Sequence, residues 1–304
     1  MLLNLWDMMM LKSVKANILV AFPYFSKQVY KTLDEANPDK FRLIIDSGAF
    51  TAWNLNKEIS FDEYCKFLKN LPRHWNYHAV QMDVFGNPEA TYKNYHKMLD
   101  LGFSKIMPVF TRGDSVERLE EFYKNTDYIM FGGIVIGGKN TNYIRWFHNQ
   151  NKKRKSHWLG FNNTEFIKHY KPESVDSSTW NNGQRFGRLD LYKGHGTFDS
   201  TQRKDWVDEP NLKRLKLLKN LGFEHKTILK LSKQSAWKGG SHSVFSKDDD
   251  YKGLAAYINN TSHLKRAIDI EKNLGTKVYL ACGNNNQIES LLHSQEHLIN
   301  NNLL

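Results

Sequence analysis

The sequence of 304 residues is 40% hydrophobic and 13% aromatic, enough to bury one large core, and its 19 glycines and 7 prolines exclude a low-complexity chain. No apolar run approaches the roughly 20 residues of a membrane span, which excludes helices that cross a bilayer and predicts no membrane partner. A net charge of +11 favours a polyanionic partner, of which nucleic acid is the usual one, over a merely basic enzyme.

Eight short apolar runs, mostly continuous rather than alternating, are predicted as strands that are buried on both faces. They lie at 17–25, 42–50, 78–85, 105–110, 128–134, 157–161, 173–177 and 277–282. Stretches with helical periodicity separate them, at 61–70, 88–101, 116–125 and 164–170. Asn87 and Pro88 supply an N-cap and a first-turn proline, and Gly102 supplies a stop. This alternation predicts an α/β fold, a (β/α)8 barrel of the TIM type, with residues 1–304 as one catalytic domain.

The alternation breaks between residues 183 and 276, ahead of the last predicted strand. This stretch is predicted to contain a hairpin at 185–193, a basic helix at 211–220, a loop at 239–250 and a helix at 255–274. We interpret residues 183–276 as an insertion on the active-site face that binds substrate, and not as an independent domain.

Only two cysteines occur, Cys65 and Cys282. So few thiols favour a reducing, cytoplasmic setting (the host cytoplasm if a phage encodes the chain) and exclude a thiolate-rich zinc site. Both cysteines are expected to be small buried side chains, and no metal or cofactor is predicted. The apolar residues 1–12 are interrupted by Asn4 and Asp7, so we interpret them as a packed terminal segment rather than a signal peptide.

Three aspartates, Asp46, Asp83 and Asp176, fall near the ends of predicted strands. The catalytic groups of TIM barrels come from the C-terminal ends of strands, although an aspartate at such an end is also common as the N-cap of the next helix. Small residues follow Asp46, and two glycines end the strand at 128–134, so a ligand could approach the backbone there. Three aspartates in one barrel therefore favour a catalytic site.

Three segments resemble motifs of the tRNA-guanine transglycosylase superfamily, and most closely of its DNA-modifying branch, the 7-deazaguanine DNA transglycosylases of phages and bacteria. Residues 46–50, DSGAF, are similar to the family's DSGG-aromatic motif, and residues 132–137, GGIVIG, to its GGLAVG loop. Asp176 follows residues 157–160, HWLG, in the order and spacing of the family's nucleophile segment. The resemblance covers about residues 40–180. It implies that guanine in DNA is exchanged for a 7-deazaguanine base.

The resemblance assigns Asp176 as the nucleophile and Asp46 as the acid and base. A carboxylate can trap the oxocarbenium-like centre that forms when the C1′–N9 bond breaks, although the residues alone leave these two roles exchangeable. Asp83 would accept hydrogen bonds from the purine N–H edge, Phe50 would stack on the base, and the Gly133 backbone would bind its carbonyl edge. The complete expected base-binding set is Asp83, Phe50, Ser47, Gly48, Gly132, Gly133 and Ile134.

The chain departs from the family in three places. It lacks the cysteine-rich zinc site of the tRNA enzymes, so no zinc subdomain is expected and DNA is favoured over tRNA. Gly138 replaces a glutamate that supports recognition of a cationic aminomethyl group, so we predict that the incoming base is the neutral 7-cyano-7-deazaguanine. Residues 107–111, MPVFT, replace a VQGG motif, so one polar reader of the base is missing.

Basic and aromatic residues interleave where a substrate strand could lie, and we expect them to contact nucleic acid. Arg185 and Arg188 are the strongest candidates because they follow Asp176 closely. The other candidates are Trp180, Lys152, Lys153 and Arg154. The target guanine must leave the helical stack, which implies base flipping or a single-stranded substrate.

Two other functions stay open from the sequence. One is a zinc-less transglycosylase that acts on tRNA or another RNA, and the other is a catalytically silent barrel that binds nucleic acid. A generic barrel hydrolase or aldolase has no phosphate-binding glycine loop or metal triad in its support. The three aspartates favour an enzyme, while a partner protein, the oligomeric state and the target sequence are left undetermined.

Overall fold

The computed structural model describes residues 14–134, 141–202, 205, 212–224 and 253–304, apart from the side chains of residues 184 and 185. Its main sheet contains parallel strands only. The strands are β1 (Ala16–Ala21), β2 (Phe41–Asp46), β3 (Tyr77–Val80), β4 (Ile106–Met107), β5 (Val109–Phe110), β6 (Tyr128–Phe131), β7 (Lys155–Trp158), β8 (Ser174–Ser177) and β11 (Lys277–Cys282). All eight predicted strands are therefore present, the fourth of them in two pieces.

Pro108 explains the two pieces of the fourth strand. Proline has no N–H to donate, so β4 and β5 are successive halves of one chain segment that Pro108 interrupts. The first half pairs with β3 and the second with β6, and the Pro108 carbonyl still accepts from the Met130 N–H at 2.8 Å. Together with the order β3-β2-β1-β11-β8-β7-β6, this arrangement nearly closes the sheet into a ring of eight strand positions. The predicted α/β fold with a TIM-type (β/α)8 barrel is confirmed.

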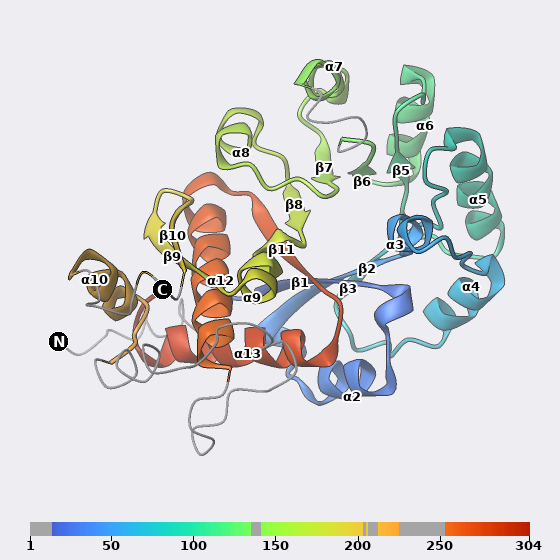
Figure 1. Ribbon diagram of the computed structural model, residues 1–304. Coiled ribbons are helices and arrows are strands. Elements are labelled where there is room, and N and C mark those ends of the chain that lie inside the picture. Colours follow the sequence, from blue (N-terminus) through green and yellow to red (C-terminus); the bar gives the residue numbers. More distant parts are fainter. Residues whose placement is uncertain (1–13, 135–140, 203–204, 206–211, 225–252) are drawn as a thin grey trace.

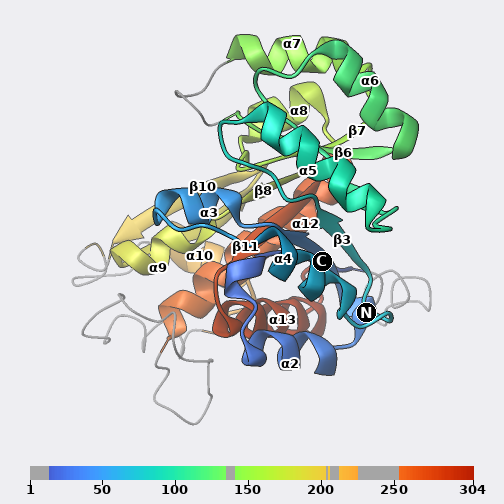
Figure 2. The ribbon, with the colours of Figure 1, turned by 90° about the vertical axis from the view of Figure 1, so that its right-hand side faces the viewer.

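Helices cover the outer side of the barrel (Figure 2). They are α2 (Lys27–Glu35), α4 (Phe61–Lys69), α5 (Pro88–Asp100), α6 (Val116–Asn125), α7 (Thr141–Asn151), α8 (Thr164–Tyr170), α12 (Leu254–Leu274) and α13 (Asn285–Asn300), while the short α3 (Ala49–Asn54) follows the C-terminal end of β2. The expected cap of α5 is present, because the Asn87 side chain accepts from the Ala90 N–H at 3.0 Å. Five predicted strands end too late, those at 17–25, 42–50, 78–85, 128–134 and 157–161. After β1, for example, a 3-10 helix begins at Phe22 with Pro23 in its first turn, and after β2 Gly48 is the N-cap of α3.

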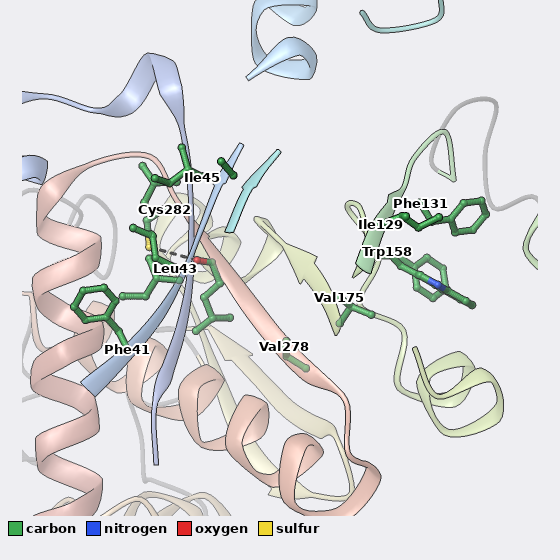
Figure 3. Packing of buried hydrophobic residues seen from close by; sticks show 14 of the residues in the cluster. Phe41, Leu43, Ile45, Ile129, Phe131, Trp158, Val175, Val278 and Cys282 are labelled. Atoms are coloured by element: carbon green, nitrogen blue, oxygen red, sulfur yellow. Dashed lines mark hydrogen bonds between the residues drawn. The ribbon is translucent and has the colours of Figure 1, made fainter. Parts of the chain in front are cut away.

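Alternating residues of each strand face opposite sides of the sheet. Ile18, Leu43 and Ile45 belong to the cluster between barrel and helices, part of which Figure 3 shows. Leu19 and Ile44, one residue out of step, join a second cluster inside the barrel, with Val80, Met107, Val109, Tyr128, Met130 and Tyr279. Because Asp46 is two residues beyond Ile44, its side chain leaves β2 on the inner side.

The insertion contains α9 (Asn182–Phe186), β9 (Arg188–Gly194), β10 (Thr197–Gln202) and α10 (Leu212–Asn220). The predicted hairpin is present but shifted, because residues 182–186 are helical and its second strand runs on to Gln202. The predicted helices at 211–220 and 255–274 are confirmed as α10 and α12. The predicted loop at 239–250 lies outside the described residues.

Helix α12 stands between the hairpin and the barrel (Figure 1) and is buried on nearly all sides. Its first turns pack with hairpin and α10 residues, including Leu189 and Leu218, while Leu264 and Ile268 join the barrel core. Arg266 donates to the Asn162 side chain at 2.7 Å and to the carbonyl of Gly196 at 2.9 Å. This buried guanidinium therefore fastens the hairpin turn to the loop after β7.

Cys65 and Cys282 are buried and unpaired, as expected. No helix in the described part of the chain is long and apolar enough to cross a membrane. The apolar N-terminal segment lies outside the described residues.

Candidate active site

The three predicted carboxylates meet at one end of the barrel. Asp46 is the last residue of β2, Asp176 is the third of four residues in β8, and Asp83 follows the end of β3 by three residues. The negative charges of Asp83 and Asp176 both raise the pKa of Asp46. The neighbouring strands β2 and β3 and the more distant β8 thus bring three acidic groups together at the C-terminal end of the barrel, as the sequence predicts.

Asp46 is the most perturbed of the three. Burial raises its pKa, and the neighbouring charge of Asp83 and, less strongly, that of Asp176 raise it further, while a hydrogen bond from the Gly48 N–H at 2.8 Å opposes the rise. The resulting pKa is about 7. A carboxyl group with a pKa near the working pH can both give and take a proton, which is the requirement for general acid–base catalysis.

The turn after β2 orients two of the carboxylates. Ser47 is fully buried; its hydroxyl donates to Asp83 Oδ1 at 2.5 Å and accepts from the Ala49 N–H at 3.2 Å. Burial raises the pKa of Asp83, and the Ser47 hydrogen bond opposes that rise. Ser47 and Gly48 were expected to contact the base; in the structure, the Ser47 hydroxyl and the Gly48 N–H donate to the carboxylates of Asp83 and Asp46.

Gly48 should not tolerate a side chain. It has a φ of +84°, and a Cβ atom there would lie 2.4 Å from Cδ of the Pro23 ring, which cannot rotate away. We expect Gly48→Ala to lower the free energy of unfolding by about 2–4 kcal/mol, the sum of left-handed strain and overpacking. Gly102→Ala is the matched control, because φ is +89° but the space is open, so only about 1–2 kcal/mol of strain applies. Urea unfolding of both variants measures the difference, and equal losses would contradict the close approach to Pro23.

Among the described residues, the hydrogen bonds to the Asp176 side chain all go to one oxygen. The Oδ1 atom of Asp176 accepts from the Gly160 N–H at 2.8 Å and pairs with His157 Nε2 at 3.0 Å. His157 is fully buried, and the Asp176 side chain keeps 11% of its surface exposed. The other oxygen, Oδ2, takes part in neither bond. A carboxylate fixed through one oxygen can present the other to a ligand.

Sequence reasoning missed a polar chain behind Asp176. His157 Nδ1 lies 2.5 Å from the Ser174 hydroxyl oxygen, which also bonds to the Tyr128 hydroxyl. The three residues come from adjacent strands β7, β8 and β6, and all are buried. Alternation would have pointed to Ser174, which is two residues before Asp176 and shares its face of β8.

Two glycines end β6 on the same rim of the barrel. Gly132 donates to the Phe110 carbonyl at 2.8 Å, and Gly133 has a φ of +72°. A Cβ atom on Gly133 would lie 3.1 Å from the Thr111 hydroxyl, so the close packing of the two strand ends favours glycine. The side chain of Ile134 packs in the outer core, which leaves only its backbone for a ligand. Gly138 lies outside the described residues.

An exposed aromatic cluster borders the carboxylates. Phe50 is 50% exposed and Trp53 59% exposed, and both rings contact Phe85, with centroids 5.3 and 4.5 Å away. Phe50 is thus not a core residue, in keeping with its expected role as a stacking surface. Trp53 and Phe85 were not predicted; their signal was the i, i+3 spacing of Phe50 and Trp53 and the position of Phe85 two residues after Asp83.

The structure differs from the prediction at two of the expected nucleic-acid contacts. Trp180 is fully buried and donates its indole N–H to the Ala281 carbonyl at 2.9 Å, so the prediction that it stacks on a base was wrong. Arg188 forms a two-pronged bond with Asp190 at 2.8 and 3.1 Å, which already neutralises its charge. The side chain of Arg185 lies outside the described residues.

Lys152, Lys153 and Arg154 lie at the wrong end of the barrel. They precede β7, so they sit at the N-terminal ends of the strands, whereas the carboxylates lie at the C-terminal ends. Arg154 is also engaged, with Glu120 at 2.7 and 3.0 Å. The prediction that this cluster lines the substrate strand was wrong, because the direction of the following strand fixes the face on which a loop lies.

Within the described ranges, no group of three His, Cys, Asp or Glu side chains could hold a metal ion. Comparison of the chain with family models, curated proteins and solved structures gave no significant match. The fold and the site define the molecule as a TIM-type barrel with a cluster of three aspartates at the C-terminal ends of its strands.

Proposed function

We propose that the protein is a guanine base-exchange transglycosylase. The observation that carries this proposal is the pairing of two unlike carboxyl groups in one site. Asp46 has a pKa of about 7 and can carry a proton, while Asp176 is oriented through one oxygen by two hydrogen bonds. Retaining glycosyl transfer needs this pair, an acid and a nucleophile with different environments.

The chemistry follows in two half-reactions. In the first, Asp176 forms a bond to C1′ of the nucleotide as the C1′–N9 bond breaks, and Asp46 gives its proton to the departing guanine. In the second, Asp46 takes the N9 proton of the incoming base, N9 attacks C1′, and the bond to Asp176 breaks with its electron pair returning to the carboxylate. Two inversions give net retention, and no atom is gained or lost.

Asp83 and the aromatic cluster of Phe50, Trp53 and Phe85 supply the binding surfaces. A carboxylate suits the N–H edge of guanine, and exposed rings suit the faces of bases. The net charge of +11 supports a nucleic-acid substrate. We propose DNA as the polymer and 7-cyano-7-deazaguanine as the incoming base, with a zinc-less RNA enzyme as the second candidate.

Incubation of the purified protein with labelled 7-cyano-7-deazaguanine and duplex DNA, single-stranded DNA or tRNA tests this proposal. We expect label to enter DNA, and none to enter with the Asp176→Asn variant. Label in tRNA alone would overturn the choice of DNA and favour the RNA enzyme. Binding of DNA without label in any polymer would favour the silent barrel, and equal incorporation of the aminomethyl base would overturn the preference for the nitrile.

A further inference from the structure

Tyr128, Ser174 and His157 form a buried chain of hydrogen bonds. Among the described residues, the side chain that this chain reaches is that of Asp176. The members of the chain lie on β6, β8 and β7, inside the barrel and beneath the site. Building such a chain replaces apolar contacts in the barrel interior with polar groups that must all be satisfied.

The protons of this chain can be assigned. An ionised carboxylate only accepts, so His157 Nε2 carries the proton in its 3.0 Å bond to Asp176. If His157 is neutral, its Nδ1 accepts from the Ser174 hydroxyl, which in turn accepts from Tyr128. Each N–H or O–H donor of the chain then has one acceptor. An imidazolium would donate from Nδ1 to Ser174 and leave one hydroxyl proton, that of Ser174 or of Tyr128, without an acceptor among the described residues.

We propose that Tyr128, Ser174 and His157 are positioning residues that hold His157 as the neutral Nε2–H tautomer and fix Asp176 through Oδ1, so that Oδ2 is the reacting oxygen. This inference rests on the proposed function for its chemical consequence. A neutral imidazole orients the carboxylate without cancelling its charge. Asp176 therefore stays nucleophilic, and the Gly160 N–H provides the second fixed point on the same oxygen.

The kinetic test uses His157→Phe, which removes the donor, and His157→Gln, which keeps an N–H. We expect His157→Phe to slow single-turnover formation of the protein–DNA adduct by about 100-fold, because a reacting oxygen displaced by about 1 Å costs a factor of that size. The KM for DNA should change little. The His157→Gln variant should recover most of this loss. His96→Phe is the control, because His96 lies on α5 in the outer helix layer, 3.0 Å from Glu121 and outside the insertion. It should lower stability without changing the adduct rate.

A second readout does not depend on catalysis. Nitrogen-15 NMR of the histidine rings, with His157 assigned by its loss in His157→Gln, should show the Nε2–H tautomer of His157 in the wild type. In Ser174→Ala this tautomer preference should weaken, because no hydroxyl then donates to Nδ1. An imidazolium signal in the wild type, or a His157→Phe variant that forms the adduct at the wild-type rate, would overturn the positioning chain. Failure of the wild type to form any adduct, with the expected NMR result, would count against the proposed function alone.

Discussion

Asp176→Asn should abolish base exchange while leaving the barrel folded. The amide oxygen can still accept from the Gly160 N–H and from His157 Nε2, so the local hydrogen bonds survive and stability should change by no more than about 1 kcal/mol. An amide cannot form the covalent bond to C1′, and loss of a nucleophile lowers turnover by at least about 10³-fold. Gel electrophoresis under denaturing conditions measures the protein–DNA adduct directly.

The matched control is Asp127→Asn just before β6, at the opposite end of the barrel, where the carboxylate lies 2.8 Å from Lys155. It should keep both the adduct and the exchange. Mass spectrometry of a trapped adduct identifies the nucleophile independently of rates. A sugar attached to Asp46 in a protein with intact Asp176 would reverse the two assigned roles.

Asp46→Asn should lose activity and gain stability at alkaline pH. Asp46 has a pKa of about 7 in the folded protein against 3.8 for the ordinary group. Between these values the folded protein holds a proton that the unfolded chain has released, so the free energy of unfolding falls as the pH rises from about 4 to 7. Above pH 7 the buried charge of Asp46 lowers the free energy of unfolding of the wild type, and the full pKa difference sets an upper bound of about 4 kcal/mol. The loss should be smaller than this bound, because Asp46 keeps some solvent contact and titrates together with Asp83.

Asparagine removes that charge and keeps an oxygen for the Gly48 N–H, so we expect the variant to be about 1–3 kcal/mol more stable than the wild type at pH 8 and nearly equal to it at pH 4. Urea unfolding at the two pH values measures this. Adduct formation should drop by about 10²–10⁴-fold, the usual contribution of an acid or base. In the wild type, adduct formation should fall tenfold per pH unit above about pH 7, because the departing guanine needs the protonated form. A pH-independent difference in stability would contradict the raised pKa of Asp46.

The strands could be predicted from the sequence because continuous apolar runs are typical of strands that are buried on both faces. Asp46, Asp83 and Asp176 could be placed together because parallel strands of a barrel end on one face, whatever their order in the chain. The same rule, applied to Lys152, Lys153 and Arg154, would have placed them on the opposite face. The error with Trp180 has another source, because proximity to Asp176 in the chain does not reveal which way a side chain turns.

The sequence by itself determined the barrel and its acidic end. Both depend on the periodicity of apolar residues, on local turn residues and on the direction of the chain, which can be read without knowing the tertiary structure. The tertiary structure alone decided the pKa of Asp46, the bond between Ser47 and Asp83, and the chain from Tyr128 to Asp176. These features depend on burial and on distances between side chains from different strands. Hydrogen bonds and charge interactions change over a few ångströms, whereas a sequence specifies only which residues are available to make them.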